Sequence, residues 1–414
     1  MQQIPFNKSC TACGACVASC PQNCVVFIED ALKNTVAVKG ANCLDCHLCE
    51  KVCPQNYQRD DLNIPKKCFA AWSLDNEIRG RSASGGVATE LYLLAAEKDM
   101  WFSGVSMSSE FKAVHQLTCD PHRITDFQNS KYVYSDMGDI FLEIVEKLKS
   151  GESVLFIGVP CQVDAIRHFC DLKRVPLDNL YLADLICHGV APAVLLHEHI
   201  EYIEKKKKCN ATEVFFRDPD NKTHTYTFSL RNNGRAFYSK KVDQNDTYQI
   251  GYHKGIIYRE NCYSCKYAQM KRAGDLTLAD FSYVGKKAAC SYGNVNVSCV
   301  LVNSEKGNRM LKALKNSGRV FCEERPMEEE IQFEHMLSAP TAIPTERQVF
   351  LKAYSQGLGF EKSMRMAAKR IILKNQIFYF FHVKGLKRWM AQNLPQELKD
   401  FLKRQNEKIN NQNG

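Results

Sequence analysis

Hydrophobic and polar positions change their spacing twice along the chain. Before residue 60 the regular pattern is confined to two short β-like runs, residues 25–28 and 36–38. From Phe69 onward, short apolar runs alternate with amphipathic segments, which is typical of strands and helices in alternation. From about Met327 to the end, the pattern is helical and polar. We therefore expect three parts of different architecture.

The alternating part supplies the elements of an α/β or α+β domain. Strands are predicted over residues 101–107, 113–118, 154–157, 181–186, 276–279 and 295–302. Helices are predicted over residues 84–97, 137–149 and 194–205, with a further helix after Cys161. A short polar connector, residues 58–67, joins this part to the N-terminal one.

Composition agrees with a folded, soluble protein of two or three domains. The chain has 414 residues, 45% of them hydrophobic, and its mean hydropathy is −0.34. No run reaches the ~18 apolar residues that a membrane-spanning helix needs. The N-terminal segment MQQIPFNKSC has neither a basic flank nor an apolar run. No secretory signal is therefore expected, and we predict a cytoplasmic protein.

Cysteine is the outlier in this composition. The chain contains 20 cysteines, and nine of them precede residue 54. Since nothing indicates export, clustered cysteines in a reducing compartment indicate metal binding rather than disulfide bonds. The metal chemistry therefore begins in a dedicated N-terminal module.

An internal repeat organises this module. The spacing C-x2-C-x2-C-x3-C-P occurs twice, and every offset between the two copies is 33 residues. The first copy comprises Cys10, Cys13, Cys16, Cys20 and Pro21, and the second comprises Cys43, Cys46, Cys49, Cys53 and Pro54. This is the spacing of bacterial ferredoxins that hold two [4Fe–4S] clusters.

The same spacing assigns the ligands to two clusters, because the fourth cysteine of each run reaches the cluster of the other run. The first set is Cys10, Cys13, Cys16 and Cys53, and the second set is Cys43, Cys46, Cys49 and Cys20. Zinc or buried free thiols are the alternatives, but zinc usually takes two separated pairs of ligands. Cys24 lies outside the pattern and is interpreted as a small apolar packing residue.

A second group of cysteines occupies two strand ends and one short loop. Cys161 follows a strand in FIGVPCQVDAIR, Cys187 follows another in DLICHGVAP, and Cys262 and Cys265 form a pair in RENCYSCKYA. Four such side chains suit a third [4Fe–4S] cluster or a structural zinc ion. The upstream ferredoxin pattern favours iron, because clusters in series conduct electrons. The other cysteines are interpreted as structural: Cys68, Cys119, Cys170, Cys209, Cys290, Cys299 and Cys322.

A glycine-rich helix start is a candidate phosphate site. In SASGGVATEL, Gly85 and Gly86 open a helix whose free N–H groups and positive dipole end suit a phosphate. Ser82, Ser84 and Thr89 can add hydroxyl donors. A helix cap without any ligand is the alternative interpretation.

Two further residues have both a functional and a structural interpretation. Lys131, in NSKYVYSD, is either a cationic partner for a phosphate or a reduced flavin, or a surface lysine. His188, beside Cys187, is either a proton carrier, because imidazole titrates near neutral pH, or a hydrogen-bonded structural histidine.

The net charge of +9 is concentrated near the C-terminus. Residues 362–408 contain twelve Lys and Arg, whereas residues 361–407 contain four acids. Such a tail suits nucleic acid, anionic lipid or an acidic partner, or it is a solvated helical surface. The tail also has an apolar face, which consists of Ile371, Ile372, Phe378 and Phe381. This face could contact a membrane or pack against the protein's own core. The last ten residues are expected to be disordered.

Several motifs in one order resemble a known family. The chain resembles the β subunit of coenzyme F420 hydrogenase and dehydrogenase, in the version with an N-terminal ferredoxin. The resemblance runs from Cys10 to about Val302. Its motifs are the two ferredoxin runs, SASGG, NSKYVYSDMGD, SVLFIGVPCQVDAIR, DLICHGVAP, GYHKGIIYRENCYSCKYA and GDLTLADF.

This resemblance implies an α+β fold with an FAD-binding α/β domain. The expected domains are a 2[4Fe–4S] ferredoxin domain at 1–60, the two parts of the F420 hydrogenase beta-like domain at 68–145 and 150–322, and a helical basic tail at 325–414. By similarity, the cluster beside the flavin is held by Cys161, Cys187, Cys262 and Cys265. The flavin residues implied are Ser84, Gly85, Gly86, Thr89 and Lys131.

One departure bears on the substrate. The family usually ends in GDFW where this chain has Ala279, Asp280, Phe281 and Ser282. The serine removes a large aromatic side chain that would shape the flavin or substrate pocket. The departure therefore concerns the substrate more than the fold.

The resemblance leads to an enzyme hypothesis, an iron–sulfur flavoprotein oxidoreductase. It would exchange electrons with a redox partner protein or ferredoxin and with a small organic acceptor, such as a deazaflavin or a polysaccharide-pathway metabolite. The alternative is a non-catalytic electron-transfer subunit that serves a partner enzyme, in surface polysaccharide biosynthesis for example. A third hypothesis is a polysaccharide-pathway component that contacts the membrane through its basic tail. No nucleic-acid partner is expected, and no catalytic residue is assigned.

Overall fold

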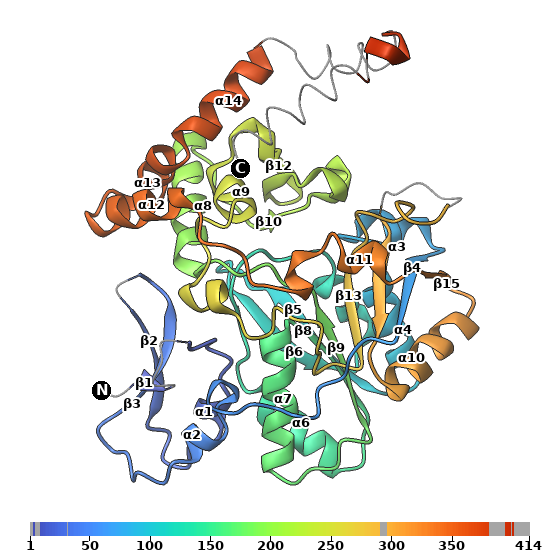
Figure 1. The fold of residues 1–414 in the computed structure, drawn as a ribbon. Helices are drawn as coiled ribbons and strands as arrows, with labels where there is room; N and C mark the ends of the chain where they lie inside the picture. Colours follow the sequence, from blue (N-terminus) through green and yellow to red (C-terminus); the bar gives the residue numbers. More distant parts are fainter. Residues whose placement is uncertain are drawn as a thin grey trace.

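The computed structural model describes residues 3–4, 9–30, 32–289, 296–380, 394–398 and 400. Four predictions lie outside these residues: Cys290 as structural, Phe381 in the apolar face of the tail, the start of a strand at residue 295, and disorder of the last ten residues. Three sheets organise the described part of the chain (Figure 1).

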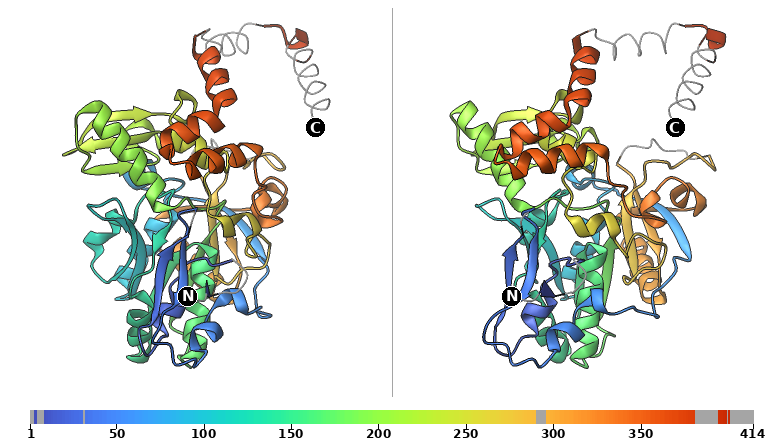
Figure 2. Two further views of the ribbon diagram at one scale, coloured as in Figure 1. Left: turned by 90° about the vertical axis from the view of Figure 1, so that its left-hand side faces the viewer. Right: turned by 60° about the vertical axis from the view of Figure 1, so that its left-hand side comes forward.

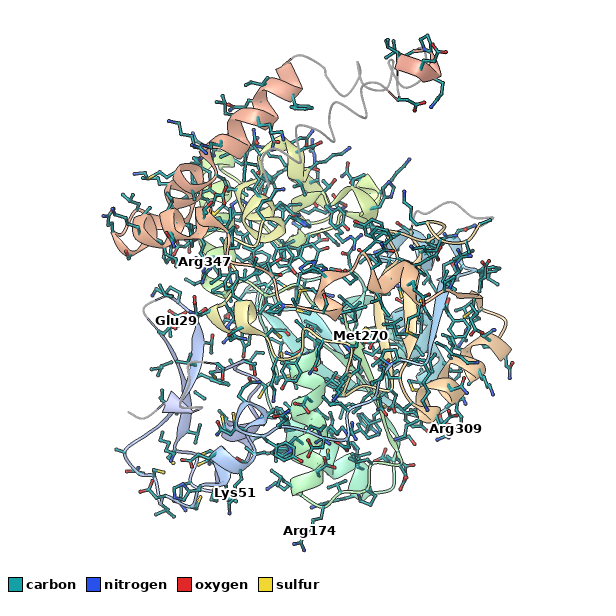
Figure 3. The ribbon with its side chains drawn as sticks, in the orientation of Figure 1. Glu29, Lys51, Arg174, Met270, Arg309 and Arg347 are labelled. Carbon is teal, nitrogen blue, oxygen red and sulfur yellow. The ribbon has the colours of Figure 1, made fainter. Side chains whose placement is uncertain are left out.

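The N-terminal domain consists of a small sheet with two cysteine-bearing loops beside it. Strands β2 (Val25–Glu29) and β3 (Thr35–Lys39) form an antiparallel hairpin, and β1 (Gln3–Ile4) pairs with the other edge of β3. Both predicted runs are confirmed as strands. The third cysteine of each run lies in a one-turn helix, α1 (Ala15–Ala18) or α2 (Leu48–Lys51), and the turn η1 (Pro54–Asn56) follows. Figure 3 places Glu29 and Lys51 at opposite ends of this domain.

A nine-stranded sheet forms the centre of the molecule, in the order β15-β4-β14-β13-β9-β8-β5-β6-β7. Strands β13, β9, β8 and β5 are mutually parallel, whereas the β15-β4-β14-β13 side and the β5–β6 pair are antiparallel. The bounds are β4 (Lys67–Ser73), β5 (Trp101–Met107), β6 (Ala113–Thr118), β7 (Ser135–Asp136), β8 (Val154–Gly158), β9 (Leu180–Leu185), β13 (Leu276–Asp280), β14 (Ser298–Val302) and β15 (Val320–Arg325).

Helices cover both faces of this sheet (Figures 1 and 2). Along β8, Val154 and Phe156 face one core and Leu155 and Ile157 face another, as the two-residue period of a strand requires. The first core contains side chains of α6 (Ile140–Lys149), α7 (Pro160–Leu172) and the ferredoxin domain. The second contains side chains of α4 (Val87–Glu97) and α10 (Glu305–Asn316). The ferredoxin domain therefore shares a continuous core with one face of the sheet.

Shorter elements connect these layers. They are α3 (Asn76–Arg81), η2 (Pro121–Arg123), α5 (Ile124–Phe127), η6 (Glu260–Ser264), α11 (Glu328–Ile331) and η7 (His335–Leu337). The predicted helix over 84–97 begins at Val87, because residues 84–86 form the turn before it.

A third unit lies beyond one end of the large sheet (Figure 1). Its sheet has the order β10-β11-β12, all antiparallel. The bounds are α8 (Ala193–Lys207), β10 (Glu213–Phe215), η3 (Pro219–Asn221), η4 (Thr223–Thr225), β11 (Phe228–Asn232), β12 (Arg235–Lys240), η5 (Val242–Gln244), α9 (Thr247–His253), α12 (Thr345–Ser355), α13 (Gly359–Ala367) and α14 (Lys369–Phe380). Ile371 and Ile372 pack against its core. In the part of the chain that is described, no helix has the length and apolar character needed to cross a bilayer.

A buried ion network fastens α13 to this third unit. The imidazole of His199, on α8, has Nε2 3.0 Å from Asp246 Oδ2 and Nδ1 2.5 Å from Glu361 Oε1. The hydroxyls of Tyr238 and Thr247 donate to these carboxylates at 2.9 and 2.7 Å. Burial lowers the pKa of His199, but the two carboxylates raise it more, to about 9. The imidazole is therefore charged at neutral pH.

This network is expected to make the chain less stable at alkaline pH. The pKa of His199 is about 9 in the folded chain and 6.5 ordinarily, so its contribution is complete below pH 6.5 and is lost as the pH rises through 9. The total loss in unfolding free energy is on the order of 3 kcal/mol. The urea midpoint of the wild type should fall over this range, whereas that of His199→Gln should fall much less. Equal falls in both proteins would contradict the assignment.

Candidate metal centres at the domain boundary

The first predicted ligand set comes together in the structure. Cys10, Cys13, Cys16 and Cys53 are all buried and line one cavity of about 260 Å³. Burial, and next the charge of Cys53, raises the pKa of Cys13 to about 12. Burial likewise raises the pKa of Cys53 to about 11. Without metal these two thiols are protonated at neutral pH, so iron binding displaces their protons.

The internal repeat reappears in the backbone of the two cysteine loops. Ala12 and Asp45, 33 residues apart, have φ angles of 54° and 48°, and Gly14 and His47 have 91° and 57°. The amides of Ala12 and Asp45 each donate to the Sγ of the cysteine two residues earlier, at 3.4 Å in both loops. Non-glycine residues rarely adopt positive φ. Its recurrence at matching positions indicates that both loops enclose the same kind of ligand.

The second ligand set is more open to solvent. Cys49 is buried, Cys20 and Cys43 are half-buried, and Cys46 is exposed. Cys24, predicted to be an apolar packing residue, instead has its Sγ 3.5 Å from that of Cys20. Hydrogen bonding with Cys20 raises the pKa of the Cys24 thiol to about 11. A fifth thiol therefore lies beside the second set, which the repeat alone did not predict.

The second group of cysteines meets between the ferredoxin domain and the large sheet. Because β8 and β9 are parallel neighbours, Cys161 and Cys187 leave the sheet at the same edge. Cys262 and Cys265 come from the loop around η6. All four line one cavity of about 760 Å³ together with ferredoxin residues such as Thr11. We call these four cysteines and their cavity the interdomain site.

The thiols of the interdomain site influence one another. Burial raises the pKa of Cys161 well above its ordinary value, and the charges of Cys265, Cys187 and Cys262 add to the effect, followed by that of Cys13. Burial raises the pKa of Cys187 to about 12. Cys161 is the second residue of α7, where the helix dipole favours a thiolate. Thr11, between Cys10 and Cys13, lines the same cavity, so the first ferredoxin set is a neighbour of this site.

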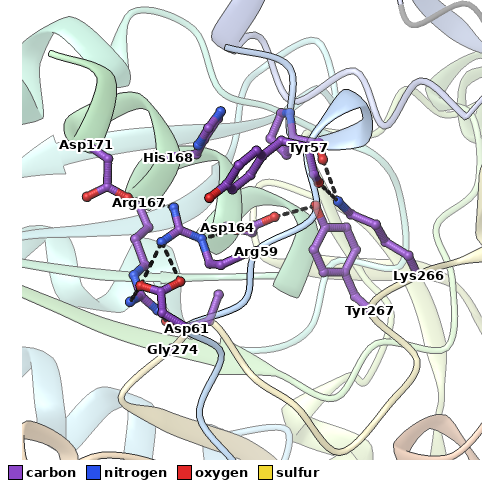
Figure 4. A network of polar contacts seen from close by, with 12 residues as sticks. Tyr57, Arg59, Asp61, Asp164, Arg167, His168, Asp171, Lys266, Tyr267 and Gly274 are labelled. Carbon is purple, nitrogen blue, oxygen red and sulfur yellow. Dashed lines mark hydrogen bonds and ion pairs between the residues drawn. The ribbon is translucent and has the colours of Figure 1, made fainter. Parts of the chain in front are cut away.

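Polar contacts fix the connector of the ferredoxin domain against α7 (Figure 4). The Arg59 guanidinium donates from Nε to Asp164 Oδ1 at 3.2 Å, and from its other nitrogens to Asp61 at 3.0 Å and Asp171 at 2.6 Å. The Tyr267 hydroxyl donates to the second oxygen of Asp164 at 2.8 Å. Asp164 lies three residues after Cys161, a predicted ligand, on the same helix, so the connector is tied to the element that carries this cysteine.

The loop that supplies Cys262 and Cys265 also holds the ferredoxin domain. Lys266 Nζ donates to the carbonyl oxygen of Tyr57 at 2.9 Å and to that of Pro54, the residue after Cys53. At the other end of the loop, Arg259 donates to further ferredoxin carbonyls. Sequence reasoning missed Arg59, Arg259 and Lys266 as contact residues. The one signal for the last two was their place in the RENCYSCKYA motif.

Two of the predicted flavin residues are engaged by the segment entering β14. Ser84 Oγ donates to the carbonyl of Val297 at 2.8 Å, and the Gly85 amide donates to Ser298 Oγ at 2.9 Å. A Cβ at position 85 would lie 2.4 Å from the carbonyl oxygen of Ala71. Glycine is therefore required here for close packing, and these donors are not available to a phosphate.

The other predicted flavin residues are also accounted for by the fold. Gly86 is the N-cap of α4 with φ 87°, and Thr89 is buried. Lys131 Nζ donates to the backbone carbonyls of residues 126, 128 and 129 at 3.1, 2.7 and 3.4 Å, and burial lowers its pKa to about 7. Neither cavity described above is lined by any of the five predicted residues. Ser84, Gly85 and Lys131 thus have donors engaged within the fold, while the assignment of the five residues to a flavin stays a prediction.

His188 and the cysteines without ligand spacing have local partners. His188 Nε2 lies 3.4 Å from Glu334 Oε2, and its ring centroid lies 5.3 Å from that of His335. This contact agrees with a structural histidine, while the role of proton carrier stays a prediction. Cys68 and Cys299 are buried on adjacent strands with their Sγ atoms 3.6 Å apart. In the departure from the family motif, Ser282 is exposed.

The two cysteine loops, their shared backbone geometry and the α/β sheet beside them define an iron–sulfur electron-transfer protein. Residues 9–57 match the family model described as "4Fe-4S dicluster domain". Residues 151–329 match the model for the C terminus of the "Coenzyme F420 hydrogenase/dehydrogenase, beta subunit". The chain thus combines an N-terminal dicluster domain with the C-terminal domain of the coenzyme F420 hydrogenase/dehydrogenase beta subunit, which confirms the resemblance over these two parts of the chain.

A solved structure is similar over most of the chain. It is a chain of the F420-reducing [NiFe] hydrogenase complex from Methanosarcina barkeri, in a xenon derivative. The match has 17% sequence identity and a TM-score of 0.45, and covers 82% of this chain and 97% of that chain. No curated protein matched the chain.

Proposed function

We propose that this chain conducts electrons between an external redox partner and an organic acceptor through three metal sites in series. When bound, [4Fe–4S] clusters supply one-electron carriers whose potentials the protein tunes. The two ferredoxin sets hold the first two clusters and the interdomain site holds the third. The convergence of Cys161, Cys187, Cys262 and Cys265 on one cavity beside the first ferredoxin set carries this proposal.

Burial supports an order for the three sites. Cys46 of the second set is exposed, whereas the first set is buried. Cys13 of the first set influences Cys161 at the interdomain site. An external carrier therefore has access at the second set, and the first set connects it to the interior of the protein.

The donor set of the interdomain site fits a cluster better than a single zinc ion. Buried cysteine thiolates are soft ligands that suit both. The first ferredoxin set adjoins the cavity, however, and this favours a cluster, because clusters in series conduct electrons. The FAD that the resemblance implies has no assigned site, because three of the five predicted residues, Ser84, Gly85 and Lys131, use their donors elsewhere. The identity of the organic acceptor rests on the resemblance alone.

Metal analysis of anaerobically purified protein tests the proposal. The wild type should contain about 12 iron and 12 sulfide per chain, four for each of three clusters. Cys187→Ala and Cys265→Ala should each lower the iron content to about eight, with the ferredoxin signals retained. Cys119→Ala, which removes an exposed thiol outside all three sites, is the matched control and should retain about 12. About eight iron in the wild type, or zinc at the interdomain site, would contradict the proposal.

A second candidate is an electron-transfer subunit that feeds a partner enzyme and binds no small substrate. It is favoured by the match to a family model of a beta subunit. Flavin assay and turnover distinguish the two. Reduction of a small acceptor such as a deazaflavin by the isolated chain would favour the enzyme, and activity confined to a complex purified from the host would favour the subunit.

A further inference from the structure

The side chain of Arg259 lies between the first ferredoxin set and the interdomain site. It is 1% exposed and lines the interdomain cavity. Its Nη1 donates to the carbonyl oxygen of Thr11 at 2.7 Å, and its Nη2 donates to those of Cys10 at 3.2 Å and Thr35 at 2.6 Å. One guanidinium therefore holds three carbonyls of the ferredoxin domain, and one of these belongs to a predicted cluster ligand.

Further contacts fix this side chain in place. The guanidinium carbon lies 4.8 Å from the ring centroid of Tyr134, and the Tyr134 hydroxyl donates to the carbonyl oxygen of Ala12 at 2.7 Å. The backbone carbonyl of Arg259 accepts a hydrogen bond from the amide of Cys262 at 3.0 Å. The side chain of Arg259 is thus bound to the ferredoxin loop that carries Cys10, and its backbone is bound to the loop that carries Cys262.

One donor of this guanidinium, the Nε–H group, makes no hydrogen bond to the described residues. Among the described residues, no acceptor lies within hydrogen-bonding distance of the buried Arg259 Nε. A buried donor on a charged group costs several kcal/mol when it has no partner, so such atoms are rare. The cavity that Arg259 lines is the one on which Cys161, Cys187 and Cys265 also converge, and bound cluster sulfur is an acceptor.

We propose that Arg259 couples the first ferredoxin cluster to the interdomain cluster. Its terminal nitrogens hold the ligand loop of the first cluster, and its Nε–H donates to a sulfur atom at the interdomain site. This inference rests on the proposed third cluster. Both a positive charge and a hydrogen bond at sulfur stabilise the more negative, reduced form, so Arg259 raises the reduction potential of the interdomain cluster. Arg259 is a positioning residue, because it acts through the two clusters.

Two substitutions separate its charge from its geometry. Arg259→Gln removes the charge, whereas Arg259→Lys retains the charge but loses the planar fork and Nε. Arg325→Lys is the matched control, because Arg325 is also buried and hydrogen-bonded but lines neither cavity. Iron is counted first. Midpoint potentials are then measured by anaerobic redox titration with EPR detection, and the interdomain signal is the one absent from Cys187→Ala.

We expect all of these proteins except Cys187→Ala to contain about 12 iron. In Arg259→Gln the reduction equilibrium of the interdomain cluster should become about tenfold less favourable, which is about 59 mV for one electron. In Arg259→Lys the shift should be smaller, and both variants should be cleaved faster by protease in the connector. A purely structural role would change cleavage but not the potential. Unchanged potentials at about 12 iron would overturn this inference alone, whereas about eight iron in the wild type would overturn the third cluster and this inference together.

Discussion

Replacing Gly85 with alanine is expected to lower the free energy of unfolding by about 4 kcal/mol. A Cβ at this position would lie 2.4 Å from the carbonyl oxygen of Ala71 and 2.8 Å from the amide nitrogen of Ser298. These atoms belong to β4 and β14, paired strands inside the nine-stranded sheet. Overpacking costs roughly 1–3 kcal/mol when side chains can yield, and here the contacts are backbone. Anaerobic urea unfolding followed by circular dichroism measures the change.

Gly80→Ala is the matched control for this substitution. Gly80 lies in α3, five residues earlier, and nothing within 4 Å would meet its added Cβ. Since alanine favours a helix interior, Gly80→Ala should stabilise the chain by about 0.5–1 kcal/mol. If Gly85→Ala kept the wild-type stability and instead lost a bound phosphate or flavin, the glycine would serve a ligand and the close-packing argument would be wrong.

Gly85 also shows where the sequence pattern stops being informative. Two glycines before an apolar helix are compatible with a phosphate loop and with a tight packing turn, because both need a backbone without Cβ. The difference depends on Ala71 and Ser298, residues that become neighbours only when β4 and β14 pair. Such long-range pairing leaves no local signal, so the flavin residues could not be verified from the motif.

Features that depend on local spacing were predicted well. The 33-residue repeat predicted that Cys10, Cys13, Cys16 and Cys53 come together, and these four cysteines line one cavity. The strands over 101–107 and 113–118 have the predicted bounds, because alternation and flanking turns are both local. Cys161 and Cys187 were expected to converge because each follows the carboxyl end of a strand, and these strands, β8 and β9, are parallel neighbours.

Features that depend on docking were not predicted. The strands β10–β12 are short and their apolar positions are few, so they produced no clear period. Hydrogen bonds to carbonyls and carboxylates that are distant in sequence are made by Arg59, Arg259 and Lys266. No sequence spacing predicts that an arginine or lysine will make such contacts. The residues that join the two domains therefore became visible only in three dimensions.

Replacing Arg59 with alanine is expected to destabilise the chain by about 3–5 kcal/mol, because it leaves a buried carboxylate without its counter-ion. The side chains of Arg59 and Asp164 are each 5% exposed. After the substitution, the Tyr267 hydroxyl at 2.8 Å is the side-chain donor that Asp164 retains. The connector over residues 58–67 should also be cleaved faster by protease, since Arg59 binds both Asp164 and Asp171 of α7. Unfolding and cleavage are measured on the anaerobic holoprotein.

A double substitution distinguishes the cost of an unpaired Asp164 carboxylate from the cost of losing the packing of the Arg59 side chain. Arg59→Met with Asp164→Asn removes both charges and keeps an oxygen for Tyr267, so it should recover at least about 1 kcal/mol relative to Arg59→Ala. Lys112→Ala, which breaks a pair whose side chains are 58% and 71% exposed, should change stability by less than about 0.5 kcal/mol. If Arg59→Ala were as mild as Lys112→Ala, the shared apolar core and the contacts of Arg259 and Lys266 would hold the ferredoxin domain without help from Arg59. The ion network beside Cys161 would then have no part in keeping the first cluster next to the interdomain site.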